Sequence, residues 1–159
     1  MRKLILSLLA VAVLGAGSAL AQSGFWAGVS AGYPGAVVHF GVENVFAGLD
    51  IRANVGYQYV GVTGVGLGAD VLYGLAVDTG TLPLDTYLGA GLQFGIGEGG
   101  SLGIGLFGGV EYRLGDVGLP EGGIFLEIGP SIGYRFDPPE DADNFKFDFI
   151  GRLGFNYHF

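Results

Sequence analysis

The stretch LDIRANVGYQY at residues 49–59 alternates apolar and polar side chains without a break. One side carries Leu49, Ile51, Ala53, Val55, Tyr57 and Tyr59, and the other carries Asp50, Arg52, Asn54, Gly56 and Gln58. Successive side chains of a β-strand point to opposite faces, so a period of two predicts a strand with one apolar and one polar face.

Seven further segments repeat this alternation and are separated by turn-rich stretches. The predicted strands are 25–33, a short one at 38–42, 49–59, 65–75, 88–96, 102–114, 124–136 and 147–159. Predicted turns lie at Pro34-Gly35, 62–63, 78–83, 97–101 and 115–122, and an acidic loop spans 137–143. No Asp, Glu, Lys, Arg, Asn, Gln or His falls on the apolar face of any predicted strand.

The composition indicates which face points outward. The chain is 50% hydrophobic with a mean hydropathy of +0.51, and 33 of its 159 residues are glycine. A soluble barrel would show water its polar face, which here is mostly glycine with few charges and makes a poor solvated surface. We therefore predict an all-β protein, an eight-stranded antiparallel up-and-down transmembrane β-barrel. Its apolar face would meet lipid, and glycine would leave room for a few large side chains in a narrow lumen.

The first residues have the pattern of an export signal. Arg2 and Lys3 precede an apolar run at 4–14, and Ala19-Leu20-Ala21 provides small residues at both positions of an A-x-A cleavage site. The run is shorter than the roughly 20 residues that a membrane-spanning helix needs. We predict a signal peptide at 1–21, cleaved after Ala21, and one outer-membrane β-barrel domain at 22–159. With an even number of strands, both ends of the mature chain would face the periplasm.

Charge and residue usage exclude several classes of function. Without Arg2 and Lys3, the 7 basic residues fall to 5 against 15 acidic ones, a net charge of about −10 for the mature chain. Such a surface does not favour nucleic acid, which binds through Lys and Arg. The absence of cysteine removes thiol chemistry, and no His pair has ligand spacing, so we predict no metal and no cofactor. Two G-x-G-x-x-G matches, at 95–100 and 103–108, open no helix and are chance matches in so much glycine.

The polar face predicts a charged lumen. Ten charged residues point inward: Glu43, Asp50, Asp70, Glu111, Glu127, Asp148, Arg52, Arg113, Arg135 and Arg152. Unpaired buried charges are costly, so we expect Arg–carboxylate pairs across the lumen, with Arg135 and Asp148 roughly opposite each other. The network would form either a packed plug or a gated pore. The narrow interior of eight strands and six large inward side chains favour the plug. These six are Trp26, Leu72, Tyr87, Phe107, Phe125 and Ile150.

A catalytic role would need a His with a Ser and an acid at one level of the barrel. His39 and His158 point inward, and Ser30 and Ser131 are the inward serines of the predicted strands. His39 near Ser30 and Glu43 is conceivable, but the pattern favours a hydrogen-bonded lumen histidine over a catalytic base. We therefore predict that the chain is not an enzyme, with a membrane-embedded lipid-modifying enzyme as the less favoured alternative.

The chain resembles the small eight-stranded outer-membrane β-barrels of the OmpA transmembrane-domain, OmpX and opacity-protein type. The resemblance rests on the architecture, the Arg/acid lumen and the ending Phe155-x-Tyr157-x-Phe159, which resembles the assembly signal of such barrels. It implies insertion by the barrel assembly machinery into outer-membrane lipid, and we expect a monomer. The short predicted outer loops weaken an adhesive role. We predict a structural, envelope-integrity role with a plugged lumen, and keep a small pore or hydrophobic-solute channel as the alternative.

Overall fold

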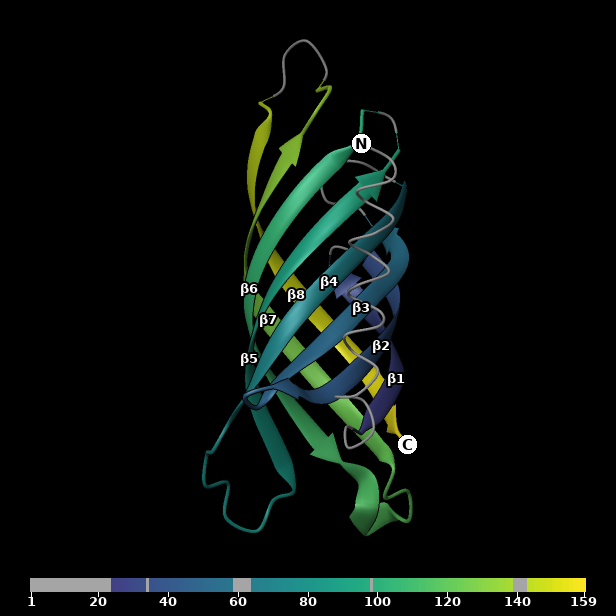
Figure 1. Cartoon of the computed structure of the whole chain (residues 1–159), viewed down its shortest axis with the longest axis vertical. Helices are drawn as coiled ribbons and strands as arrows, with labels where there is room; N and C mark the ends of the chain where they lie inside the picture. The colour runs from purple at the N-terminus through teal and green to yellow at the C-terminus, as the bar shows by residue number, and fades with distance from the viewer. Residues whose placement is uncertain (1–23, 34, 59–63, 98, 139–142) are drawn as a thin grey trace.

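The chain forms a closed antiparallel β-barrel (Figure 1). The computed structural model describes residues 24–33, 35–58, 64–97, 99–138 and 143–159. The strands are β1 (Phe25–Tyr33), β2 (Gly35–Phe46), β3 (Leu49–Gln58), β4 (Gly64–Leu75), β5 (Leu84–Ile96), β6 (Ser101–Arg113), β7 (Gly122–Arg135) and β8 (Phe145–His158). A short 3₁₀ helix, η2 (Leu114–Val117), follows β6. Each strand pairs with the next in sequence and β8 pairs with β1, which confirms the predicted fold class.

Two strands are at least four residues longer than their predicted segments. The prediction of a short second strand is wrong, because β2 has 12 residues and begins by pairing Gly35 with Gln58. β5 begins at Leu84, opposite Tyr112, four residues before the predicted start at Leu88. In both places backbone pairing extends beyond the regular apolar alternation, so the alternation alone underestimates the length of the paired strand.

Several predictions fall outside the described residues. These are the signal peptide with Ala19 and Ala21, the aromatic Tyr59, the turn at 62–63 and parts of the turns at Pro34, Glu98 and 139–142. Within the described ranges, no helix is long and apolar enough to cross a membrane.

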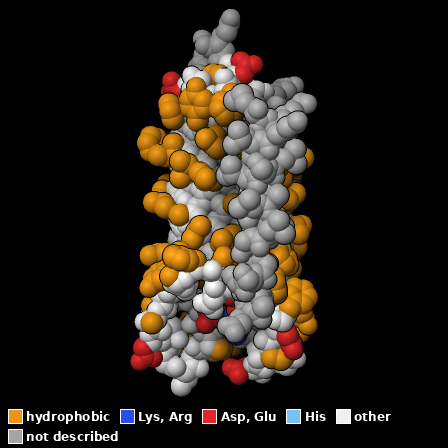
Figure 2. Space-filling view, viewed as in Figure 1, with side chains coloured by type: hydrophobic (Ala, Val, Ile, Leu, Met, Phe, Trp, Pro, Cys, Tyr) orange, Lys and Arg blue, Asp and Glu red, His pale blue; other side chains and the backbone are white. Residues whose placement is uncertain are grey.

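The barrel places apolar side chains outside and charged side chains inside. Val38 is 61% exposed and Ile128 is 65% exposed, whereas Arg52 is 1% exposed and Glu127 is fully buried. Figure 2 shows hydrophobic side chains along the wall, with acidic ones gathered at the two ends. This is the reverse of a water-soluble domain and the arrangement that transmembrane barrels adopt.

Glycines on the inner face make room for the large lumen side chains. A Cβ added at Gly41 would overlap the Trp26 indole, and one added at Gly89 would overlap the Phe107 ring. Gly154 has the same relation to Phe125. Much of the glycine on the inner face thus serves packing inside a narrow barrel, as predicted.

Candidate functional site: the charged lumen

Four charged side chains meet at the centre of the lumen, and we call them the quartet: Arg52 of β3, Asp70 of β4, Glu127 of β7 and Arg152 of β8. Register explains the assembly, because Arg52 lies directly opposite Asp70 and Glu127 lies directly opposite Arg152. The two cross-strand pairs then join across the barrel, with Arg52 Nη1 2.6 Å from Glu127 Oε1. Arg52 Nη2 lies 2.7 Å from Asp70 Oδ2, and Arg152 Nη2 lies 2.7 Å from Glu127 Oε2.

The quartet is balanced in charge and enclosed. Asn54 Nδ2 donates to Asp70 Oδ2 at 2.8 Å, and Tyr87 Oη donates to Glu127 Oε1 at 2.8 Å. The guanidinium carbons of the two arginines lie 5.4 and 5.1 Å from the centre of the Phe107 ring. Two positive and two negative charges, each with several partners, meet the condition for burying ions.

Apolar side chains pack around the quartet. Trp26, Leu72, Phe107 and Ile150 form one buried cluster, and Tyr87 packs against it. Phe125 is buried as well, at 1% exposure, so all six predicted inward side chains lie in the interior. The quartet and this cluster together are called the plug below. They lie in the middle of the lumen, and the interior of an eight-stranded barrel is in general about wide enough only for side chains.

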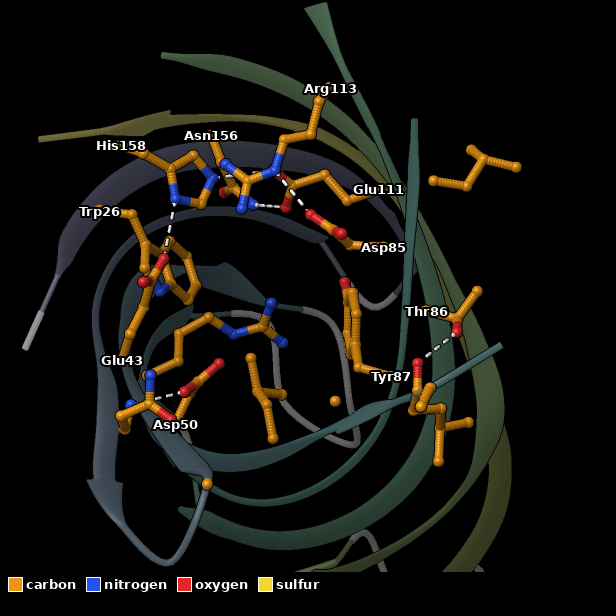
Figure 3. Close-up of a pocket in the computed structure, with 18 of the residues that line it drawn as sticks. Trp26, Glu43, Asp50, Asp85, Thr86, Tyr87, Glu111, Arg113, Asn156 and His158 are labelled. Carbon is orange, nitrogen blue, oxygen red and sulfur yellow. Dashed lines mark hydrogen bonds and ion pairs between the residues drawn. The ribbon is translucent and has the colours of Figure 1, made fainter. Parts of the chain in front are cut away.

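A polar cavity of about 400 Å³ opens at the end of the barrel where β1 begins and β8 ends, and we call it the terminal pocket (Figure 3). Arg52, Leu72 and Tyr87 of the plug form part of its lining. Besides Arg52, four carboxylates, one further arginine and one histidine line its walls: Glu43, Asp50, Asp85, Glu111, Arg113 and His158. Acidic groups therefore outnumber basic ones in this pocket, unlike in the quartet.

The walls of the terminal pocket are joined by hydrogen bonds and ion pairs. His158 Nε2 lies 2.8 Å from Glu111 Oε1, and His158 Nδ1 lies 3.1 Å from Glu43 Oε1. Arg113 Nε lies 2.7 Å from Asp85 Oδ2. Asp50 accepts from the backbone N–H of Asn44 at 2.8 Å.

Both histidines form hydrogen bonds with other side chains of the lumen. His39 Nε2 lies 2.8 Å from Asn156 Oδ1, and His158 sits between two carboxylates. In the described part of the chain, neither Ser30 nor Ser131 forms a hydrogen bond with a histidine. Nor do the described residues contain a group of three His, Cys, Asp or Glu that could hold a metal ion.

The opposite end of the barrel departs from prediction. Asp148 lies opposite Ser131, and the backbone N–H of Arg135 donates to Asn144 O, so Arg135 and Asp148 are not opposite each other. The composition of a hairpin loop does not set its register, so counting back from the acidic loop misplaced the pair. Asp148 instead binds Lys146 Nζ at 2.8 Å and the Tyr33 hydroxyl, and no ion pair joins Arg135 to another described residue.

The ten predicted lumen residues thus separate into groups. Arg52, Asp70, Glu127 and Arg152 form the quartet, while Glu43, Asp50, Glu111 and Arg113 line the terminal pocket. Asp148 and Arg135 lie towards the other end. Sequence reasoning placed His158 in the lumen without its carboxylate partners, and it missed Asn156 and Asp85. Their inward parity on β8 and β5 was a usable signal, but Asp85 lay before the predicted start of its strand.

The chain ends on the outer face of β8. Tyr157 is 39% exposed and Phe159 is 76% exposed, and their ring centres lie 5.2 Å apart. Phe155 lies two residues earlier on the same face, opposite Val29 and Ile124. The backbone N–H of Phe159 donates to Phe25 O at 2.8 Å, so this residue is hydrogen-bonded to the first residue of β1.

Among solved structures, Neisserial surface protein A (NspA) is similar to this chain at 15% sequence identity and a TM-score of 0.44. The similarity covers 86% of this chain and 94% of that chain. No family model and no curated protein matches the sequence. The function proposed below therefore rests on this chain's own geometry.

Proposed function

We propose that this chain is an integral protein of the bacterial outer membrane with a structural, envelope-integrity role, and that its lumen is closed by the plug. The observation that carries the proposal is the inverted barrel. Its outer wall is apolar, whereas its charges are buried and paired at the centre. Exposing that apolar wall to water is unfavourable, whereas the hydrocarbon of a bilayer can cover it.

The plug supports a role without transport. Arg52 and Arg152 are fixed by carboxylates and by contact with the Phe107 ring, which leaves the quartet no unpaired charge to attract an ion. Opening a passage would require separating several short ion pairs in a low-dielectric interior. The function of such a barrel would depend on its outer wall and its two ends and not on transport through the lumen.

The aromatic residues at the end of β8 suggest how the chain is inserted into the outer membrane. The aromatic residues Phe155, Tyr157 and Phe159 lie at the end of the closing strand, where they are available to the barrel assembly machinery and then to outer-membrane lipid. We propose both as partners and a monomer as the working form. The predicted signal peptide would supply export to the periplasm.

Spin labelling tests the membrane placement, because the sequence has no cysteine and accepts single labels. A nitroxide at Val55→Cys, on the outer face of β3, should collide with membrane-dissolved oxygen and be shielded from a water-soluble nickel complex. A label at Asp116→Cys in η2, an exposed residue between β6 and β7, is the matched control and should show the reverse. Access of the nickel complex to the label at residue 55 in vesicles would overturn the proposal.

A small pore is the second candidate, and the terminal pocket is the observation that favours it. The pocket admits small solutes into one end of the lumen as far as Arg52 and Tyr87. Conduction separates the two functions, since a pore passes ions across a planar bilayer and a plugged barrel does not.

A further inference from the structure

Two side-chain bridges cross the strand that closes the barrel. β1 lies between β2 and β8, and at nine residues it is shorter than either. Asn156 of β8 bonds to His39 of β2, and His158 of β8 bonds to Glu43 of β2. Both bridges therefore link the two neighbours of β1 directly, on the lumen side of β1.

Two glycines, Gly24 just before β1 and Gly28 within it, leave room for these side-chain bridges. Gly28 is paired with His39 on one side and Asn156 on the other, and a Cβ at Gly28 would collide with the two atoms of that hydrogen bond. At Gly24 an added Cβ would lie 2.6 Å from Glu43 Oε2. The small residues before and within β1 thus leave the space through which β8 reaches β2.

Hydrogen-bond roles specify the protons in the bridges. Asn156 Nδ2 donates to Glu111 Oε2 at 2.6 Å, so Asn156 Oδ1 must accept and His39 Nε2 must carry a hydrogen. His158 differs, because its two ring nitrogens each face a carboxylate oxygen, of Glu43 and of Glu111. A carboxylate only accepts, so both contacts are satisfied only when the imidazole carries two protons and a positive charge.

We propose that His158, Glu43 and Glu111 form a proton-dependent latch that holds β8 to β2 and β6 and so secures the closing seam between β1 and β8. With two protons the imidazolium donates to both carboxylates. With one proton it can donate to only one of them, and its bare nitrogen then faces the other carboxylate. The seam is therefore tighter in the doubly protonated state and loosens as pH rises.

The charges around the latch come from four strands. Glu43 faces His158 from β2, Glu111 and Arg113 face it from β6, and Asp50 of β3 and Asp85 of β5 line the same pocket. Arg113 lies 3.5 Å from Glu111 and pairs with Asp85, so it offsets part of the acidic excess. Among the members of the latch, His158 is the side chain whose ordinary pKa lies nearest to neutral pH.

Hydrogen exchange of β1 amides, measured by NMR on the full chain in lipid, tests the latch. Expressed as protection factors, which remove the intrinsic effect of pH, protection in the native chain should fall about tenfold between pH 6.0 and 9.5, the size expected for one hydrogen bond to a charged group. His158→Gln should show low protection at both pH values. Asp85→Asn is the control, because it changes a carboxylate of the same pocket outside the latch, and it should keep the fall.

Two further results keep the proposal open to refutation if His158→Gln does not assemble. Glu43→Gln should reduce the pH dependence, and the imidazole ¹⁵N shifts of His158 should show two protonated nitrogens at pH 7.5. Equal protection of β1 at pH 6.0 and 9.5, the same fall in Glu43→Gln as in the native chain, or a neutral imidazole at pH 7.5 would each overturn the latch.

Discussion

The plug and the terminal pocket both contain arginines and carboxylates, but they differ in charge balance and in exposure to water. In the plug, two arginines and two carboxylates are balanced in number and no more than 2% exposed. In the pocket, the Arg113–Asp85 pair has side chains that are 32% and 58% exposed, and carboxylates are in excess. Water can solvate the surplus charge of the pocket, whereas the interior tolerates ions only as matched sets.

The comparison suggests that one lumen can combine buried ion pairs that stay fixed with solvent-exposed hydrogen bonds that respond to conditions such as pH. The charges of the quartet are buried and are paired with one another by short contacts. The pocket is open to water, and His158 forms two of its hydrogen bonds, one to Glu43 and one to Glu111. Stability and closure should therefore depend on the plug, and sensitivity to conditions should depend on the pocket.

Removing one charge from the quartet should have the largest effect. Glu127→Gln keeps the shape of the side chain but leaves two arginines with Asp70 alone. An uncompensated buried charge costs about 3–5 kcal/mol, so the free energy of unfolding should fall by that amount. Urea unfolding of the protein in lipid vesicles, followed by tryptophan fluorescence of Trp26, measures it. A loss below about 1 kcal/mol would show that the quartet is hydrated and not a plug.

Filling glycine sites should have an intermediate effect that depends on the region. Gly89→Ala places a methyl group against the Phe107 ring in the plug, and overpacking of this kind costs about 1–3 kcal/mol. Gly74→Ala is the matched control, because Gly74 lines the terminal pocket and an added Cβ there meets nothing within 4 Å. Its effect on unfolding should be near zero. Equal losses from the two variants would mean that the two regions are packed alike.

Neutralising the pocket ion pair should have the smallest effect. Asp85→Asn breaks the contact with Arg113 where both side chains reach water, and such pairs are worth about 0–1 kcal/mol. The difference from the native chain should shrink further in high salt, since exposed charges are screened. A loss as large as that of Glu127→Gln would contradict the hydrated character of the pocket.

The fold was predictable from the sequence because alternation reports which face of each strand is apolar. Residues 49–59 already specify that Arg52 and Asn54 share a face with Asp50, and the structure places Arg52 and Asn54 inside. Which charges meet was not predictable, because it depends on the stagger between strands, which alternation leaves undetermined. Arg52 and Arg152 are 100 positions apart in the chain numbering and come together only through the register of the closed barrel. The misplacement of Arg135 relative to Asp148 has the same cause.

Electrical recording from the purified protein in a planar bilayer tests the central claim that the plug closes the lumen. Heat-modifiable migration on a gel would first establish that the inserted sample is a folded barrel. We predict no unit steps of ion current from the native chain. Arg52→Ala should be silent as well, because Trp26, Leu72, Phe107 and Ile150 still fill the cross-section. Reproducible conductance steps from the native chain would contradict the account, because ions would then pass where the structure places the plug.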